Sequence, residues 1–147
     1  MIKSVRIFYL IAAWLFPVAI LVQVFFVGLS LLAGQAYWGT HVEFGHTIIV
    51  LPLLLVILAY LGRVPRVEKW LVWSQFGVCL VQTEVFATIR EAVPLLAAFH
   101  PVLALVLFAL ALIIALRARA VIRAKVQRSA IAQQLPTMKE TGALASD

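Results

Sequence analysis

Seven polar side chains that could do chemistry lie within or beside long apolar stretches of this sequence. They are Gln23, His41, Glu43, His46, Gln82, Glu84 and His100. Polar groups are costly to keep inside a bilayer, so those that lie there commonly mark a site that handles ions, protons or ligands. Imidazole nitrogens bind iron and other transition metals, whereas carboxyl groups transfer protons. These residue types predict a cofactor or metal site inside a membrane protein.

His46 and His100 are the pair with the most specific chemistry. We expect His46 early in one apolar helix and His100 at the start of another, because Pro101 follows it and proline is tolerated in a first helical turn. The two histidines then share a depth, and they face each other if their helices are diagonal in an up-down bundle. Two neutral imidazoles in this arrangement are an axial ligand pair for haem b. We therefore expect a b-type haem with His46 and His100 as metal ligands.

Three further residues fit such a cofactor. Gly28 and Gly45 would leave room beside a flat porphyrin, although glycine in membrane helices also serves close packing. Gln82 could hydrogen-bond the second nitrogen of a ligating imidazole and so orient it. We assign all three residues to the cofactor-binding site.

Glu84 and His41 are candidates for a proton relay or an entry for quinone. A charged carboxylate in lipid is costly, so we expect Glu84 to be protonated or paired with Arg90, His41 or His46. A mononuclear metal site of His46, Glu84 and His100 is an alternative. However, the stretch 41–46 lacks the His-Glu-x-x-His spacing that aligns two zinc ligands on one helical turn.

The elements that must hold these residues are membrane-spanning helices. The chain has 147 residues, of which 65% are hydrophobic and 12% charged, whereas a soluble domain has roughly 45–50% and about 25%. Four stretches approach the roughly 20 apolar residues needed to cross a bilayer: 5–33, 43–62, 70–90 and 101–117. A backbone in lipid must satisfy its own hydrogen bonds, so each is expected to be helical. The predicted fold is all-α, a four-transmembrane-helix up-down bundle.

The basic residues predict the orientation of this bundle. The net charge is +6. Every Lys and Arg except Arg90 lies next to those ends of the apolar stretches that are on the same side of the bundle as the two chain termini. Cytoplasmic flanks carry the excess of Lys and Arg, so both termini are expected in the cytoplasm, with the bundle in the surrounding membrane. Cations interleaved with apolar runs do not form the basic stripe of a nucleic-acid-binding surface. The single cysteine, Cys79, excludes an intrachain disulfide.

The C-terminal part divides into two expected segments. Residues 117–134 alternate Arg or Lys with apolar residues, which predicts a basic helical extension on the lipid surface and a transmembrane domain over residues 1–134. A solvated basic tail explains the same pattern. Residues 135–147 have too little apolar content to pack and are expected to be disordered.

The helix plan, with histidines near the outer ends of the second and fourth stretches, resembles small bacterial cytochrome b561-like membrane haem proteins. More specifically, Gln23-Val-Phe-Phe-Val-Gly28, His46 and Phe99-His100-Pro101 are similar to a family of small bacterial four-helix membrane proteins of unassigned function. This resemblance covers residues 5 to 120. The cytochrome resemblance implies electron transfer, with quinone or superoxide as partners. The chain departs from it in lacking a second histidine pair, which leaves one haem near the outer face.

Two other functions fit the same sequence. A noncatalytic accessory or assembly subunit of a larger membrane complex, or a bundle that binds a second copy of itself, would use the polar residues to hold helices together. A carrier for a small solute or proton would depend on Glu84, although four helices enclose little space.

Overall fold

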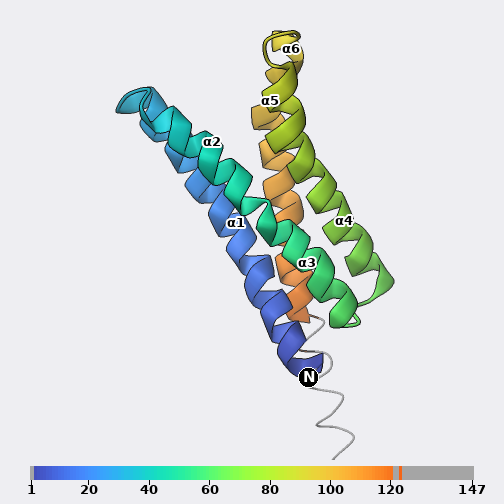
Figure 1. Cartoon of the computed structure of the whole chain (residues 1–147). Coiled ribbons are helices and arrows are strands. Elements are labelled where there is room, and N and C mark those ends of the chain that lie inside the picture. Colours follow the sequence, from blue (N-terminus) through green and yellow to red (C-terminus); the bar gives the residue numbers. More distant parts are fainter. Residues whose placement is uncertain (1, 121–122, 124–147) are drawn as a thin grey trace, which may run out of the picture.

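The computed structural model describes residues 2–120 and 123, whose regular secondary structure is entirely helical. Four long helical segments run alternately up and down (Figure 1). In chain order the elements are α1 (Ile2–Leu32), α2 (Tyr37–Ile48), α3 (Val50–Leu61), α4 (Arg66–Leu80), the π-helical turn η1 (Val81–Val85), α5 (Phe86–Ile89), α6 (Pro94–Ala97) and a helix over 100–120. The expected all-α, four-helix architecture is confirmed.

Three segments of the described chain are long and apolar enough to cross a membrane. They are Ser4–Leu32, Tyr37–Leu61 and Pro94–Ala120. The stretch expected at 70–90 lies in the helical segment 66–89, which is not among them. The buried face of this segment carries Glu68, Gln75 and Gln82, at intervals of seven residues. These polar side chains lower the mean hydropathy of the segment.

The second segment begins earlier and bends more than the sequence indicated. It starts at Tyr37 rather than near residue 43, and it is interrupted at Ile49 between α2 and α3. Pro52 explains the interruption, because proline has no N–H to donate to the carbonyl of Ile48, and its ring crowds that carbonyl. The earlier start places six more residues, including His41, within the helix.

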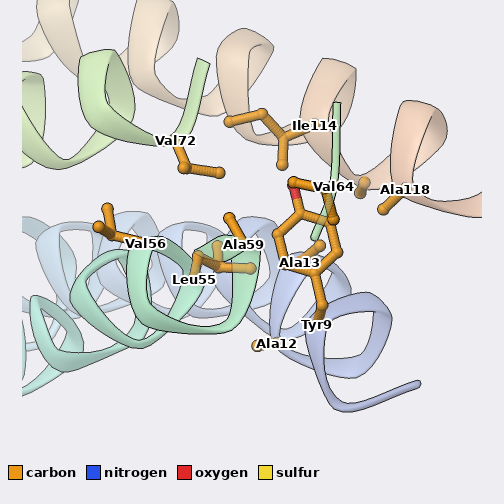
Figure 2. Packing of buried hydrophobic residues seen from close by; sticks show 11 residues of the cluster. Tyr9, Ala12, Ala13, Leu55, Val56, Ala59, Val64, Val72, Ile114 and Ala118 are labelled. Carbon is orange, nitrogen blue, oxygen red and sulfur yellow. The ribbon is translucent and has the colours of Figure 1, made fainter. Parts of the chain in front are cut away.

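The four segments converge at the end of the bundle that holds the N-terminus (Figure 1). A cluster of buried side chains fills this end, with contributions from every segment and from the α3–α4 turn (Figure 2). Its members are Tyr9, Ala12, Ala13, Leu55, Val56, Ala59, Val64, Val72, Ile114, Ala115 and Ala118. The many alanines let the backbones approach closely, as small residues do in the helix bundles of membrane proteins.

Polar contacts at the same end fasten the segments together. Arg6 donates from Nε to the carbonyl of Gly62 at 2.7 Å and from Nη2 to that of Arg63 at 3.0 Å, which satisfies carbonyls at the C-terminus of α3. Arg117 binds Glu68 Oε1 through Nη2 at 2.8 Å and Nε at 2.9 Å. We call this the basic end, and the opposite end, with the connections 33–36 and 90–99, the histidine end. The expected extension over 117–134 and tail over 135–147 lie outside the described residues, apart from 117–120 and 123.

Gln75 is a polar residue that is buried in the packing of the bundle. Its side chain is fully buried on α4, and neither its amide nitrogen nor its amide oxygen has a hydrogen-bond partner in the described part of the chain. An unmade hydrogen bond in the interior costs more than an apolar group of the same shape. We predict that Gln75→Leu raises the free energy of unfolding by about 1–2 kcal/mol, measured by thermal or denaturant unfolding in detergent micelles. A decrease would mean that buried water satisfies the amide.

Candidate functional site

Four polar side chains, one from each helical segment, gather at the histidine end. They are Gln23 of α1, His41 of α2, Gln82 of η1 and His100 of the helix over 100–120. His41 and Gln82 are buried, and Gln23 and His100 are partly buried. The cluster is therefore a junction at which all four segments meet through polar groups.

Gln23 and His41 hold each other by two hydrogen bonds. Gln23 Nε2 donates to the carbonyl of His41 at 2.7 Å, and His41 Nδ1 lies 3.2 Å from the carbonyl of Gln23. A carbonyl can only accept, so Nδ1 of His41 carries the hydrogen. A neutral His41 ring then has its acceptor lone pair on Nε2, which is the arrangement of a metal-ligating histidine oriented by a backbone carbonyl.

The rings of His41 and His100 lie next to each other. Their centroids are 6.2 Å apart and their planes are 71° from parallel. Trp38 stacks on His41 at 5.1 Å, and Phe86 lies edge-on to His100 at 5.6 Å. Two imidazole rings, from the second and fourth segments, therefore lie next to each other, and each of them contacts an aromatic side chain.

Gln82 joins this site from a turn with unusual backbone geometry. In η1 the Phe86 N–H bonds to the carbonyl of Val81, five residues back, and Thr83 Oγ1 donates to the carbonyl of Cys79 at 3.1 Å. Single π turns of this kind occur often at functional sites. From η1, Gln82 Nε2 donates to the carbonyl of His100 at 3.1 Å and anchors the first turn of the last helix.

Both glutamines keep one oxygen without a partner. Oε1 of Gln23 and Oε1 of Gln82 are buried and accept no hydrogen bond from residues 2–120 and 123, and Oγ of Ser30 on α1 likewise has no partner among them. Buried polar atoms normally find partners. These oxygens are available to a donor, such as a water molecule or a ligand hydroxyl.

His46 has an exposed side chain, and its polar contacts are with Val42 and Glu84. Its side chain is 48% exposed, and its Nδ1 donates to the carbonyl of Val42 at 2.8 Å. Its Nε2 lies 3.6 Å from Glu84 Oε1, one of the partners expected for Glu84. The structure therefore brings His41, and not His46, to His100. The reason is the earlier start of α2, which places His41 on the buried side of the helix.

The two glycines expected beside a cofactor have different surroundings. A Cβ at Gly45 would lie 2.6 Å from Gln23 Nε2, whereas one at Gly28 would meet nothing within 4 Å. Gly45 thus makes room for the amide that holds His41.

This contrast gives a matched pair of variants. Gly45→Ala must displace the Gln23 amide from the His41 carbonyl, which removes one hydrogen bond worth about 1 kcal/mol. We predict a corresponding fall in the midpoint of thermal unfolding for Gly45→Ala and little change for Gly28→Ala. Equal midpoints for the two variants would show that the close approach is unimportant.

The alternative of a metal site with three protein ligands is not supported. Among residues 2–120 and 123, no three or more His, Cys, Asp or Glu side chains are grouped so that they could hold a metal ion. His46, Glu84 and His100 therefore do not form such a centre. A pair of histidines could still bind a metal ion that is itself held within a larger cofactor.

Gln23, Trp38 and Phe86 are the members of the site that sequence reasoning did not assign to it. Gln23 joins α1 to α2, and Trp38 stacks on His41. Their positions relative to His41 and His100 depend on where helices begin, so spacing alone gave no sign of them.

Comparison with known families relates part of this site to other proteins. Residues 23–88 match the model of a family of unknown function (DUF6220). The match includes Gln23, His41 and Gln82 and ends before His100. Comparison with curated proteins and with solved structures finds no match. The segment from the middle of α1 to α5 is thus similar to a family of unassigned function, as the resemblance led us to expect.

Proposed function

We propose that the protein is an integral-membrane b-type haem protein that transfers electrons near the histidine end, and that His41 and His100 are the residues that would hold the haem iron. The observation that carries the proposal is the meeting of the two imidazole rings, whose centroids are 6.2 Å apart. Rings this close could each offer a nitrogen to one metal ion, because imidazole nitrogens bind metals at about 2.0–2.1 Å. Bundle cores commonly hold such cofactors. His41 takes the place of His46 in this proposal.

The surrounding groups fit the ligand role. The carbonyl of Gln23 holds Nδ1 of His41 and leaves Nε2 available, and Gln82 fixes the backbone at His100. Trp38 and Phe86 lie against the rings, and such apolar neighbours would affect the reduction potential of a bound haem. Bound haem would supply one-electron transfer, with a quinone or a partner membrane subunit as the other reactant.

We infer further that all four segments span a bacterial inner membrane with both termini in the cytoplasm. The cations Arg6, Arg63 and Arg117 gather at the basic end, whereas Arg90 lies at the other, and an excess of Lys and Arg is typical of the cytoplasmic side. Insertion of the segment 66–89 into the membrane is supported by the burial of its charged residue Glu68. This carboxylate is bound by Arg117, so it would not be exposed to lipid.

An absorption spectrum tests the haem proposal. The full chain, expressed with haem supplied and purified in detergent, is expected to show a Soret band and, after reduction, the sharp visible bands of six-coordinate haem b. The ratio of haem to protein should approach one. Protein that is folded by circular dichroism but lacks these bands would contradict the proposal.

A second candidate, an accessory subunit of a membrane complex, is favoured by the position of the His46–Glu84 pair. The two side chains are 48% and 57% exposed, although they belong to segments that we infer to span the membrane. Exposure of ionisable groups to lipid is costly, and a partner protein or a second copy of this chain would cover them.

The pair also separates the two candidates. If the accessory function holds, His46→Ala with Glu84→Ala converts a larger assembly to the single chain on native gels, and the spectrum of the solubilised protein stays featureless. If the haem function holds, the same double variant retains its visible bands.

A further inference from the structure

A groove at the basic end combines two cations with three aromatic rings. It encloses about 690 Å³ between the last turn of α3 and the first turns of α4, and its lining residues are Tyr60, Arg66, Lys69, Trp70 and Trp73. We propose that this groove binds the phosphate headgroup of an anionic phospholipid from the leaflet at the basic end. The proposal is independent of any cofactor at the histidine end.

The walls of the groove are held in place by contacts among its own residues. Lys69 Nζ lies 4.6 Å above the centre of the Tyr60 ring, and Trp73 Nε1 donates to the Tyr60 hydroxyl at 3.2 Å. Because that hydroxyl accepts from Trp73, its own hydrogen remains available to an acceptor such as a phosphate oxygen. These contacts hold the Lys69 cation and the Tyr60 hydroxyl donor next to each other before any anion binds.

Among the residues that the structure describes, no carboxylate lines the groove, so its positive charge is not neutralised by them. The nearest acidic residue in the sequence, Glu68, is 1% exposed and is bound by Arg117 on the buried face of α4. Arg66 also lies at the N-terminus of α4, where the helix dipole favours an anion. The charge of the groove therefore complements a phosphate.

The surroundings of the groove favour a lipid over a free ion. Tyr60, Trp70 and Trp73 are all exposed on the bundle surface, and such amphipathic rings typically lie at the level of lipid headgroups. Leu53 and Ile57 continue the exposed face of α3 away from Tyr60, with the spacing of one helical face. A headgroup in the groove would thus have its acyl chains beside an apolar surface.

Thermal unfolding of the full chain in neutral detergent, with lipid titrated in, tests the proposal. We expect phosphatidylglycerol to raise the unfolding midpoint at concentrations at which phosphatidylcholine has no effect. In the double variant Arg66→Gln with Lys69→Gln, the apparent dissociation constant for phosphatidylglycerol should increase about 25-fold, at about fivefold for each cation.

The matched control is Arg63→Gln with Arg119→Gln, which removes two exposed cations outside the groove lining. We expect it to change the dissociation constant less than twofold. An equal loss of affinity in the control would show diffuse electrostatic attraction and would overturn the site. Equal stabilisation by phosphatidylcholine, or by inorganic phosphate alone, would overturn the assignment to an anionic lipid.

Discussion

His41→Ala is expected to purify with at least tenfold less haem per protein than the unaltered chain, whereas His46→Ala is expected to retain its full haem content. His41 is 8% exposed and lies against His100, with Nδ1 held by the carbonyl of Gln23. Its loss would remove one of two axial ligands, while His46 contacts Val42 and Glu84 outside the site. The measurement is haem absorbance relative to protein after purification in detergent.

The two histidines form a matched comparison because both belong to α2 and both donate to a backbone carbonyl. His100→Ala should reproduce the effect of His41→Ala. Circular dichroism of each variant checks that the helices are intact. Loss of haem from His46→Ala with retention in His41→Ala would reverse our assignment of the second ligand.

Arg117→Ala is expected to cause the largest loss of stability among single changes at the basic end. It leaves the carboxylate of Glu68, which is 1% exposed, without its cation, and Glu68 Oε2 already lacks a partner. Removal of one partner from a buried ion pair is strongly destabilising because the remaining charge stays uncompensated. We expect most of the protein to be lost as aggregate on extraction, measured as the fraction that elutes as a single species in size-exclusion chromatography.

Arg119→Ala is the control, since Arg119 is two residues away on the same helix and its side chain is exposed. Glu68→Gln combined with Arg117→Gln should recover much of the loss, because no buried charge remains. Equal yields from Arg117→Ala and Arg119→Ala would show that the ion pair contributes little to folding.

Helical class and chain reversal could be predicted from the sequence because long apolar runs leave the backbone few alternatives. The buried face of the second segment could also have been predicted from the sequence. Counting back from Ala59 in steps of three and four residues through Leu55, Pro52, Ile48 and Gly45 leads to His41, and all of these positions are buried. His46 is one residue from Gly45 and is therefore turned about 100° away.

The choice of His46 over His41 arose from the boundary of the helix. With a start near residue 43, His41 falls in the connection, whereas the observed start at Tyr37 includes it. The start of α2 has no apolar pattern in the sequence, since it contains Thr40, Glu43 and the aromatic pair at 37–38. This part of the helix is held by contacts with α1 instead. Element ends depend on such tertiary contacts and are poorly determined by local pattern.

Two other features depend on geometry that the sequence does not encode locally. The π turn over Val81–Val85 contains neither proline nor glycine to mark it. The reciprocal bonding of Gln23 and His41 requires close approach of α1 and α2 at Gly45. Both follow from the packing of whole helices, so the polar cluster of four segments emerged only from the assembled bundle.

Electron paramagnetic resonance of the oxidised full chain, loaded with haem, tests most directly whether His41 and His100 ligate one iron. Two imidazole ligands produce a low-spin ferric signal, which we expect in the unaltered protein and in His46→Ala. In His41→Ala the signal should become high-spin or disappear. A high-spin signal in the unaltered protein, or a low-spin signal that persists in His41→Ala, would contradict the account.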